Sequence, residues 1–185
     1  MRQNNMERKI FNPRQRDEVN FLKLASETNS TSTLVEVELA PGGGVGLHYH
    51  KTYSEKFSCL GGELSVQLDS NTQVLKPGDG ATAQPYVNHR FFNPTDKPCR
   101  FQVELNPASR GFEISLQMGY GLARDGQTRK GGMPKDSLVL AWLFETSESN
   151  LKGWRSIFEF ILRRQAKKAR EKGIDKIMME KYVKF

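Results

Sequence analysis

All three histidines of this chain lie in two short segments, and one of these segments also carries a closely spaced carboxylate. His48 and His50 are separated by one residue, Glu55 follows His50 after four more, and His89 lies in the second segment. In a β-strand, residues i and i+2 point to the same face, so the first two imidazoles would share one face. Imidazoles with a carboxylate are ligands that first-row transition metals accept. The spacing therefore predicts a metal site formed by these four side chains.

Such a site has the composition of a catalytic rather than a purely structural metal centre. Three neutral imidazoles and one carboxylate leave a divalent ion with a net charge of about +1 and about one or two open coordination positions. Iron, manganese, nickel, copper and zinc all accept this set, and the sequence does not select among them. The alternative is a buried polar cluster without metal, but burying four such groups unpaired costs free energy. We expect one divalent transition metal ion, with Glu55 as the catalytic residue that acts as a base.

The residues around this cluster have the pattern of short β-strands. Apolar and polar residues alternate in residues 35–39, 64–68 and 101–105, so each strand would bury one face. Turn-forming Pro and Gly residues interrupt this pattern at 41–44 and 77–80, and the turns recur about every 8 to 12 residues. This spacing predicts an all-β sandwich or barrel.

The metal-site motifs resemble the two signatures of the cupin superfamily. The first signature, Gly-x5-His-x-His-x4-Glu-x6-Gly, matches at every fixed position between Gly42 and Gly62. The second is matched at four positions: Gly80, Pro85, His89 and Asn93. Here Val87 stands where the family usually has glycine, and the interval from Pro85 to His89 is one residue short, which indicates a reshaped turn. The resemblance, to small single-domain cupin-2 type conserved barrel proteins, implies a double-stranded β-helix, or jelly-roll barrel, that binds one metal inside.

Composition and periodicity divide the chain into three expected regions. These are an N-terminal arm at residues 1–16, a cupin β-barrel domain at 17–107 and a C-terminal helical extension at 108–185 with a basic tail. Residues 152–185 hold 11 Lys+Arg and 4 Asp+Glu, which accounts for the whole net charge of +7. Because the charge belongs to the tail, it does not indicate a nucleic-acid partner for the barrel.

The clearest predicted helix lies in this tail. Five apolar residues follow one helical stripe: Trp154, Ile157, Phe158, Ile161 and Leu162. We expect this stripe to pack on the barrel or on a second chain, which favours a homodimer. Contact of the basic helix with an anionic membrane surface or with an acidic partner is the less favoured alternative.

Two further features bear on location and on competing chemistry. The longest apolar run, residues 138–144, falls short of the roughly 20 residues that cross a bilayer, and residues 1–5 lack a signal-peptide core. We therefore expect a cytoplasmic protein. Cys59 and Cys99 match no zinc spacing and are interpreted as two ordinary thiols.

Three classes of function remain open from the sequence. The favoured one is a metal-dependent dioxygenase acting on a small organic, perhaps aromatic, substrate, because the site is open, the barrel wall is mostly apolar and the resemblance to cupins offers precedent. Strand parity places Phe57 and Phe91 beside the ligands, where we expect them to be core residues and, as the alternative, part of the pocket lining. The second is a non-redox isomerase, decarboxylase or lyase, in which the ion polarises a carbonyl and Glu55 acts as a base. The third is a non-catalytic module that binds or senses a small molecule through the ion.

Overall fold

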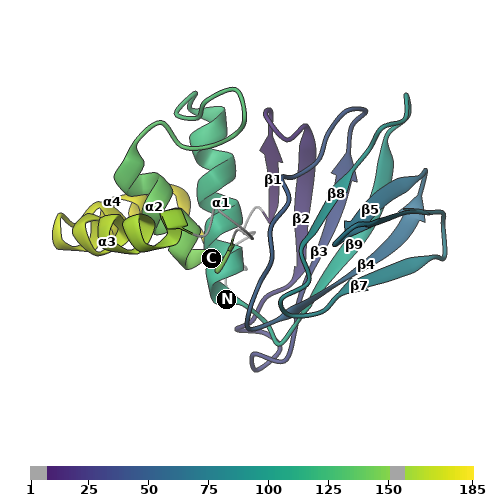
Figure 1. Ribbon diagram of the computed structural model, residues 1–185, viewed down its shortest axis with the longest axis horizontal. Helices are drawn as coiled ribbons and strands as arrows, with labels where there is room; N and C mark the ends of the chain where they lie inside the picture. Colours follow the sequence, from purple (N-terminus) through teal and green to yellow (C-terminus); the bar gives the residue numbers. More distant parts are fainter. Residues whose placement is uncertain (1–7, 151–156) are drawn as a thin grey trace, which may run out of the picture.

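The computed structural model describes residues 8–150 and 157–185, which form nine strands and four helices. The strands are β1 (Lys9–Asn12), β2 (Asp17–Lys23), β3 (Thr33–Leu39), β4 (Ser54–Gly61), β5 (Leu64–Leu68), β6 (Asn71–Leu75), β7 (Gly80–Ala83), β8 (His89–Phe92) and β9 (Cys99–Asn106). The helices are α1 (Arg110–Arg124), α2 (Ser137–Thr146), α3 (Ile157–Glu171) and α4 (Ile174–Tyr182). Figure 1 shows the strands and the helices as two neighbouring groups, with α1 beside β1 and the other helices farther from the strands.

The strands form two antiparallel sheets. One sheet has the order β1-β2-β3-β9-β4-β7, and the other has the order β6-β5-β8. Isolated bridges join Gly44 to Phe92 and His48 to His89, so the connection between β3 and β4 lies beside β8. The predicted jelly-roll β fold is therefore confirmed, but within residues 8–150 and 157–185 the strands do not form the expected closed barrel. The β3–β4 connection pairs through isolated bridges instead of a continuous ladder, which leaves two separate sheets.

The main core is built by the alternating strands, and it joins residues of both sheets. In β3, Val35, Val37 and Leu39 are buried while the residues between them are more exposed. The same alternation buries Phe101, Val103 and Leu105 in β9. They pack in one cluster with Leu64 and Val66 of β5, from the other sheet. The predicted strand parity is thus confirmed in β3 and β9, because a two-residue repeat puts one face of each strand in the core. In β5 the prediction is wrong at Ser65, which is buried together with Leu64 and Val66.

The helices form a second core of their own. Ser109 caps α1 by accepting a hydrogen bond from the backbone N–H of Phe112, and Asp136 caps α2 in the same way. The buried residues of this second cluster come from all four helices: Met118, Leu122, Val139, Ala141, Trp142, Ala166, Ala169 and Tyr182. The extension therefore has a hydrophobic core apart from that of the sheets.

Helix α3 packs differently from the sequence prediction. Its buried face contains Ala166 and Ala169, with Leu162 partly buried beside them, whereas Ile161 is 52% exposed and Phe160 is 74% exposed. Small alanines allow α3 to approach α2 and α4 closely, and these helices cover its described apolar face. The ion pair of Glu159 with Lys51, at 3.9 Å, joins α3 to the connection between β3 and β4. The prediction that Ile161 belongs to the buried stripe is therefore wrong. Trp154 and the side chains of Ile157 and Phe158 lie outside the described residues.

Buried polar groups join the helices to the larger sheet. The carboxylate of Glu113 in α1 is fully buried and accepts hydrogen bonds from the Ala25 N–H at 2.6 Å and from the Thr33 hydroxyl at 2.8 Å. The Tyr120 hydroxyl of α1 donates to Asp17 of β2 at 2.6 Å. These bonds hold α1 against β1–β3.

The expected boundaries fall close to changes in secondary structure. The last strand ends at Asn106 and the first helix begins at Arg110, on either side of the expected boundary at 107/108. Residues 9–12 of the expected N-terminal arm form β1, which pairs with β2. The division into three regions itself stays a prediction. No helix in the described part of the chain is long and apolar enough to span a membrane.

Candidate metal centre

The fold brings together the three histidines that the sequence places in two distant segments. His48 and His50 lie in the connection between β3 and β4, and His89 is the first residue of β8. The backbones of His48 and His89 pair directly, with N–O distances of 3.0 and 2.7 Å. This bridge places residues 41 positions apart in the sequence next to each other in space.

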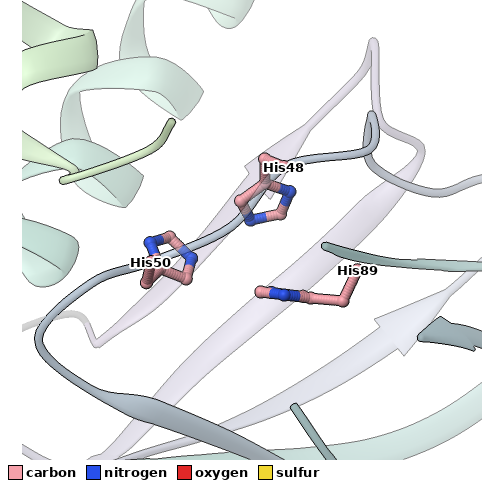
Figure 2. Close-up of side chains that lie close together, drawn as sticks. All are labelled: His48, His50 and His89. Carbon is pink, nitrogen blue, oxygen red and sulfur yellow. The ribbon is translucent and has the colours of Figure 1, made fainter. Parts of the chain in front are cut away.

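The three imidazole rings surround a common space (Figure 2). One ligand atom from each histidine can be chosen so that all three lie within 4.8 Å of one another. The ring centroid of His48 is 4.8 Å from that of His50 and 4.6 Å from that of His89. His50 and His89 are buried, and His48 is half-buried. Three histidines are therefore positioned to hold one metal ion.

Two of the histidines have their outward-facing ring nitrogens engaged by nearby backbone. The Nδ1 atom of His48 lies 2.8 Å from the carbonyl oxygen of Gly46, and that of His89 lies 2.9 Å from the carbonyl oxygen of Val87. A carbonyl only accepts hydrogen bonds, so we assign the ring proton to Nδ1 in both residues. Their Nε2 lone pairs are then free to bind a metal.

Glu55 lies beside the three histidines, on β4. Its carboxylate oxygens are 3.4 Å from Nε2 of His50 and 3.3 Å from Nε2 of His89. Burial alone would raise the pKa of Glu55, but the two imidazoles outweigh burial and hold that pKa well below its ordinary value. The carboxylate is therefore ionised at neutral pH. Its roles as the fourth ligand and as the catalytic base stay predictions.

The donor atoms fit a metal ion because they are otherwise unsatisfied. Nε2 of His50 and Nε2 of His89 are buried and have no hydrogen-bond partner of good geometry, although the Glu55 oxygens are close. Neighbouring ligands that are each about 2.1 Å from a metal lie about 3.0 to 3.4 Å apart, which matches the distances from Glu55. Buried nitrogens without partners are costly, and a shared ion would satisfy both of them.

Burial and neighbouring charges shift the pKa values of two of the histidines in opposite directions. Burial, together with the neighbouring His89 and His50, lowers the pKa of His48 to about 4. Burial also disfavours charge on His89, but the Glu55 carboxylate outweighs it and raises the pKa of His89 above its ordinary value. The Glu55 carboxylate therefore favours positive charge beside it, and a bound metal cation would make the same favourable interaction.

The turn before His89 contains a residue with a left-handed backbone, and its difference from the usual cupin turn stays a prediction. Tyr86 adopts a left-handed φ of 68°, next to Val87, which stands where cupins usually have glycine. The backbone N–H of Tyr86 donates to the carbonyl of His50 at 2.7 Å, and its ring stacks on that of Tyr49. The shortened turn thus adds a second link between the two histidine segments.

Aromatic side chains form the wall on the inner side of the site. Phe57 is fully buried, and its ring centroid lies 6.1 Å from that of His89 and 6.1 Å from that of Phe91. Phe57 therefore belongs to the core and also borders His89, whereas Phe91 packs behind it against Phe57 and Phe101. Asn93 instead completes a turn, as its donation to the Lys97 carbonyl at 2.8 Å shows. Both cysteines are buried and free, as expected.

Sequence reasoning missed Tyr53 and the segment after α2. The Tyr53 hydroxyl lies 2.8 Å from Nδ1 of His50, and the Glu148 carbonyl lies 3.3 Å from the same nitrogen. Glu148 and Asn150 also line a cavity of about 270 Å³ between the β3–β4 connection, α2 and α3. Tyr53 follows His50 by three residues, which is a weak signal, and nothing in the sequence of 147–150 indicates contact with the site.

A two-sheet jelly roll with three histidines positioned to hold one metal ion is the architecture of a β protein with a candidate metal site. The cupin domain family (Cupin_2) matches residues 35–105, which include all four predicted ligands. The chain belongs to the cupin superfamily.

Three curated relatives are similar to parts of this chain. Protein SchB of Streptomyces halstedii is 33% identical over 98 residues, which cover 52% of this chain and 70% of SchB. The polyketide synthase CurC of Streptomyces cyaneus is 36% identical over 70 residues, covering 37% of this chain and 45% of CurC. An oxidoreductase of Arthrobotrys oligospora is 26% identical over 111 residues, covering 56% of this chain and 43% of the relative. The chain thus spans less than half of the last two relatives.

Among solved structures, an RmlC-like cupin from Shewanella frigidimarina has a similar fold. The TM-score is 0.50 at 21% sequence identity, and the match covers 58% of this chain and 91% of that chain. This likeness supports the fold alone.

Proposed function

We propose that this protein is a metal-dependent oxidoreductase, specifically a dioxygenase that acts on a small phenolic or enolic substrate. The observation that carries the proposal is the buried pair of unpartnered Nε2 atoms, on His50 and His89, beside the half-buried His48. One relative, named an oxidoreductase, supports the class, and CurC, named a polyketide synthase, supports the kind of substrate. Polyketide-like molecules carry the phenol and enol groups that the proposal requires of a substrate.

In this proposal the chain's own residues have distinct tasks. His48, His50 and His89 would hold the ion, and Glu55 would complete the ligand set or accept a proton from the substrate hydroxyl. When bound, a redox-active ion with an open position supplies a place where substrate and dioxygen react. Phe57, with Phe91 packed behind it, would form an apolar wall that limits the access of water to that space.

The first experiment measures metal content and oxygen consumption together. Purified protein is loaded separately with iron, manganese, nickel, copper or zinc, and each form is tested with phenolic, enolic and thiol-bearing compounds in an oxygen electrode. We expect about one metal ion per chain and oxygen uptake with the iron or manganese form. Glu55→Gln is expected to impair turnover more than substrate binding, because it removes the base but keeps the shape of the side chain.

An anaerobic product assay run beside it separates the other two classes of function. Turnover that continues without oxygen would assign the protein to the isomerases, decarboxylases or lyases. Tight binding of a compound without turnover under either condition would leave a binding or sensing module. Protein that binds no transition metal in any loading experiment would contradict the proposal at its first step.

A further inference from the structure

His50 depends on a remote part of the chain, unlike the other two histidines. His48 and His89 take their Nδ1 partners from carbonyls two residues away in the sequence. By contrast, the Glu148 carbonyl near Nδ1 of His50 is 98 positions away, in the segment that follows α2. The helical extension therefore contacts the back of one predicted metal ligand.

Tyr53 is the main contact between His50 and this segment. Its side chain is buried, and its ring stacks on the His50 ring with a centroid distance of 4.3 Å and an interplanar angle of 26°. Its hydroxyl lies 2.8 Å from Nδ1 of His50 and donates to the carbonyl oxygen of Ser147 at 3.1 Å. One hydroxyl thus links the ligand to the end of α2.

The two partners of this hydroxyl settle the direction of its hydrogen bonds. The Ser147 carbonyl can only accept, so the single hydroxyl proton of Tyr53 points toward it. The phenolic oxygen then accepts from the ring of His50, which puts the imidazole proton on Nδ1. The lone pair of His50 is left on Nε2, the buried nitrogen that faces Glu55 and has no hydrogen-bond partner.

The segment that accepts the hydrogen bond of the Tyr53 hydroxyl is held beside the site by hydrogen bonds of its own. Tyr49 and Asn150 exchange backbone hydrogen bonds of 3.1 and 2.9 Å. The side-chain amide of Asn150 donates to the Glu148 carbonyl at 2.6 Å. The carbonyls behind His50 are therefore fixed by pairing between the extension and the histidine segment itself.

We propose that Tyr53, oriented by the Ser147 carbonyl of the helical extension, is a positioning residue that keeps the His50 ring turned with Nε2 toward the metal. This inference rests on the proposed metal function. It assigns to the extension a role at the site, because removing the link frees the His50 ring to change its proton position and its orientation. Partners of this kind typically change metal affinity by about 10- to 100-fold.

The test compares two tyrosine-to-phenylalanine variants of the full chain. Tyr53→Phe removes the link at the site, and Tyr120→Phe removes a buried tyrosine hydrogen bond to Asp17 as the matched control. Zinc affinity is measured by competition with a chelator. We expect Tyr53→Phe to weaken zinc binding about tenfold, the lower end of the range, because the Glu148 carbonyl remains near Nδ1. Tyr120→Phe is expected to bind zinc like the unmodified protein.

A second readout uses the metal-free protein and does not depend on metal binding. Imidazole ¹⁵N spectra report which nitrogen of each histidine carries the proton. We expect His50 to carry it on Nδ1 in the unmodified chain and to show a mixture in Tyr53→Phe, while His48 and His89 stay unchanged. Asn150→Ala, which loosens the segment without touching the histidine ring, is expected to shift His50 in the same direction by a smaller amount.

The outcomes separate this inference from the proposed function. An unmodified protein that fails to bind zinc or other metals contradicts the proposed function, while the ¹⁵N comparison still decides the role of Tyr53. Equal zinc affinity and an unchanged His50 proton position in Tyr53→Phe overturn the inference. Equal losses in Tyr53→Phe and Tyr120→Phe also overturn it, since they would reflect destabilisation shared by both variants.

Discussion

Two buried polar clusters in this molecule differ in how completely their groups are satisfied. At the junction of α1 with the sheet, the Glu113 carboxylate receives hydrogen bonds from Ala25, Thr33 and Arg110. At the histidine cluster, Nε2 of His50 and Nε2 of His89 are equally buried but lack such partners. A satisfied buried group is explained by the fold, whereas an unsatisfied one requires a ligand or a function.

The largest effect is expected from breaking the satisfied cluster. Glu113→Ala leaves the buried Ala25 N–H and Thr33 hydroxyl without their acceptor, so we expect it to lower the free energy of unfolding by about 3 kcal/mol or more. Glu113→Gln keeps an acceptor oxygen and should cost less. Chemical denaturation of the three proteins measures the difference. A loss below about 1 kcal/mol in the alanine variant would mean that this junction contributes little.

Asp17 is only partly satisfied, because one carboxylate oxygen accepts from Tyr120 and the other has no hydrogen-bond partner. Its contribution to the stability of the fold depends on pH. Burial raises the pKa of Asp17 to about 6 despite the Tyr120 hydrogen bond, from an ordinary value of 3.8. The folded state therefore binds this proton more tightly than the unfolded chain does. The contribution of Asp17 to stability is highest below about pH 4 and falls as the pH rises through about 6. Asp17→Asn should raise stability at pH 7 by as much as about 3 kcal/mol and change little below about pH 4.

Denaturation at a series of pH values tests this prediction. Glu113→Gln provides the comparison, because it changes a carboxylate at the same junction outside β2. An Asp17→Asn variant that is destabilised at every pH would show that the charged carboxylate is held by interactions stronger than its burial cost.

In the unsatisfied cluster, we expect substitution of a histidine to lower the amount of metal bound. His50→Ala and His89→Ala are each expected to lower metal occupancy at least about tenfold, which corresponds to about 1.4 kcal/mol of binding free energy. Elemental analysis of each purified variant measures occupancy, with Glu113→Gln as the control that leaves the histidines intact. Stoichiometric metal in a protein that lacks all three histidines would place the ion elsewhere.

The smallest expected effect is the difference in stability between substitutions on the buried and the exposed face of α3. Leu162 packs into the helical core, whereas Ile161 is 52% exposed. Leu162→Ala is therefore expected to cost about 1 to 2 kcal/mol of stability and Ile161→Ala less than about 0.5 kcal/mol. Thermal unfolding of both variants measures the ratio. Equal losses would indicate that Ile161 is covered in solution, as it would be in the homodimer that we expect from the sequence.

The amino-acid sequence determined the chemistry of the site and the parity of the strands. The alternation in β3 and β9 depends on a repeat of two residues, which any β-strand obeys. The expected strand at His48 and His50 is instead a connection with isolated bridges, although the two rings still lie 4.8 Å apart. The resemblance to cupin signatures added the relation of His89 to the first pair. Local rules therefore suffice wherever a residue's role depends on neighbours a few positions away.

The tertiary structure alone decided which remote groups meet. The contact of Tyr53 with the Ser147 carbonyl joins segments 94 residues apart, and no periodicity in either segment encodes it. The face of α3 was also decided by its partners, because Ala166 and Ala169 fit closely between α2 and α4 while the more hydrophobic Ile161 stays outside. Hydrophobicity predicts that a residue can be buried, but only the shape of the packed neighbours determines which residue is.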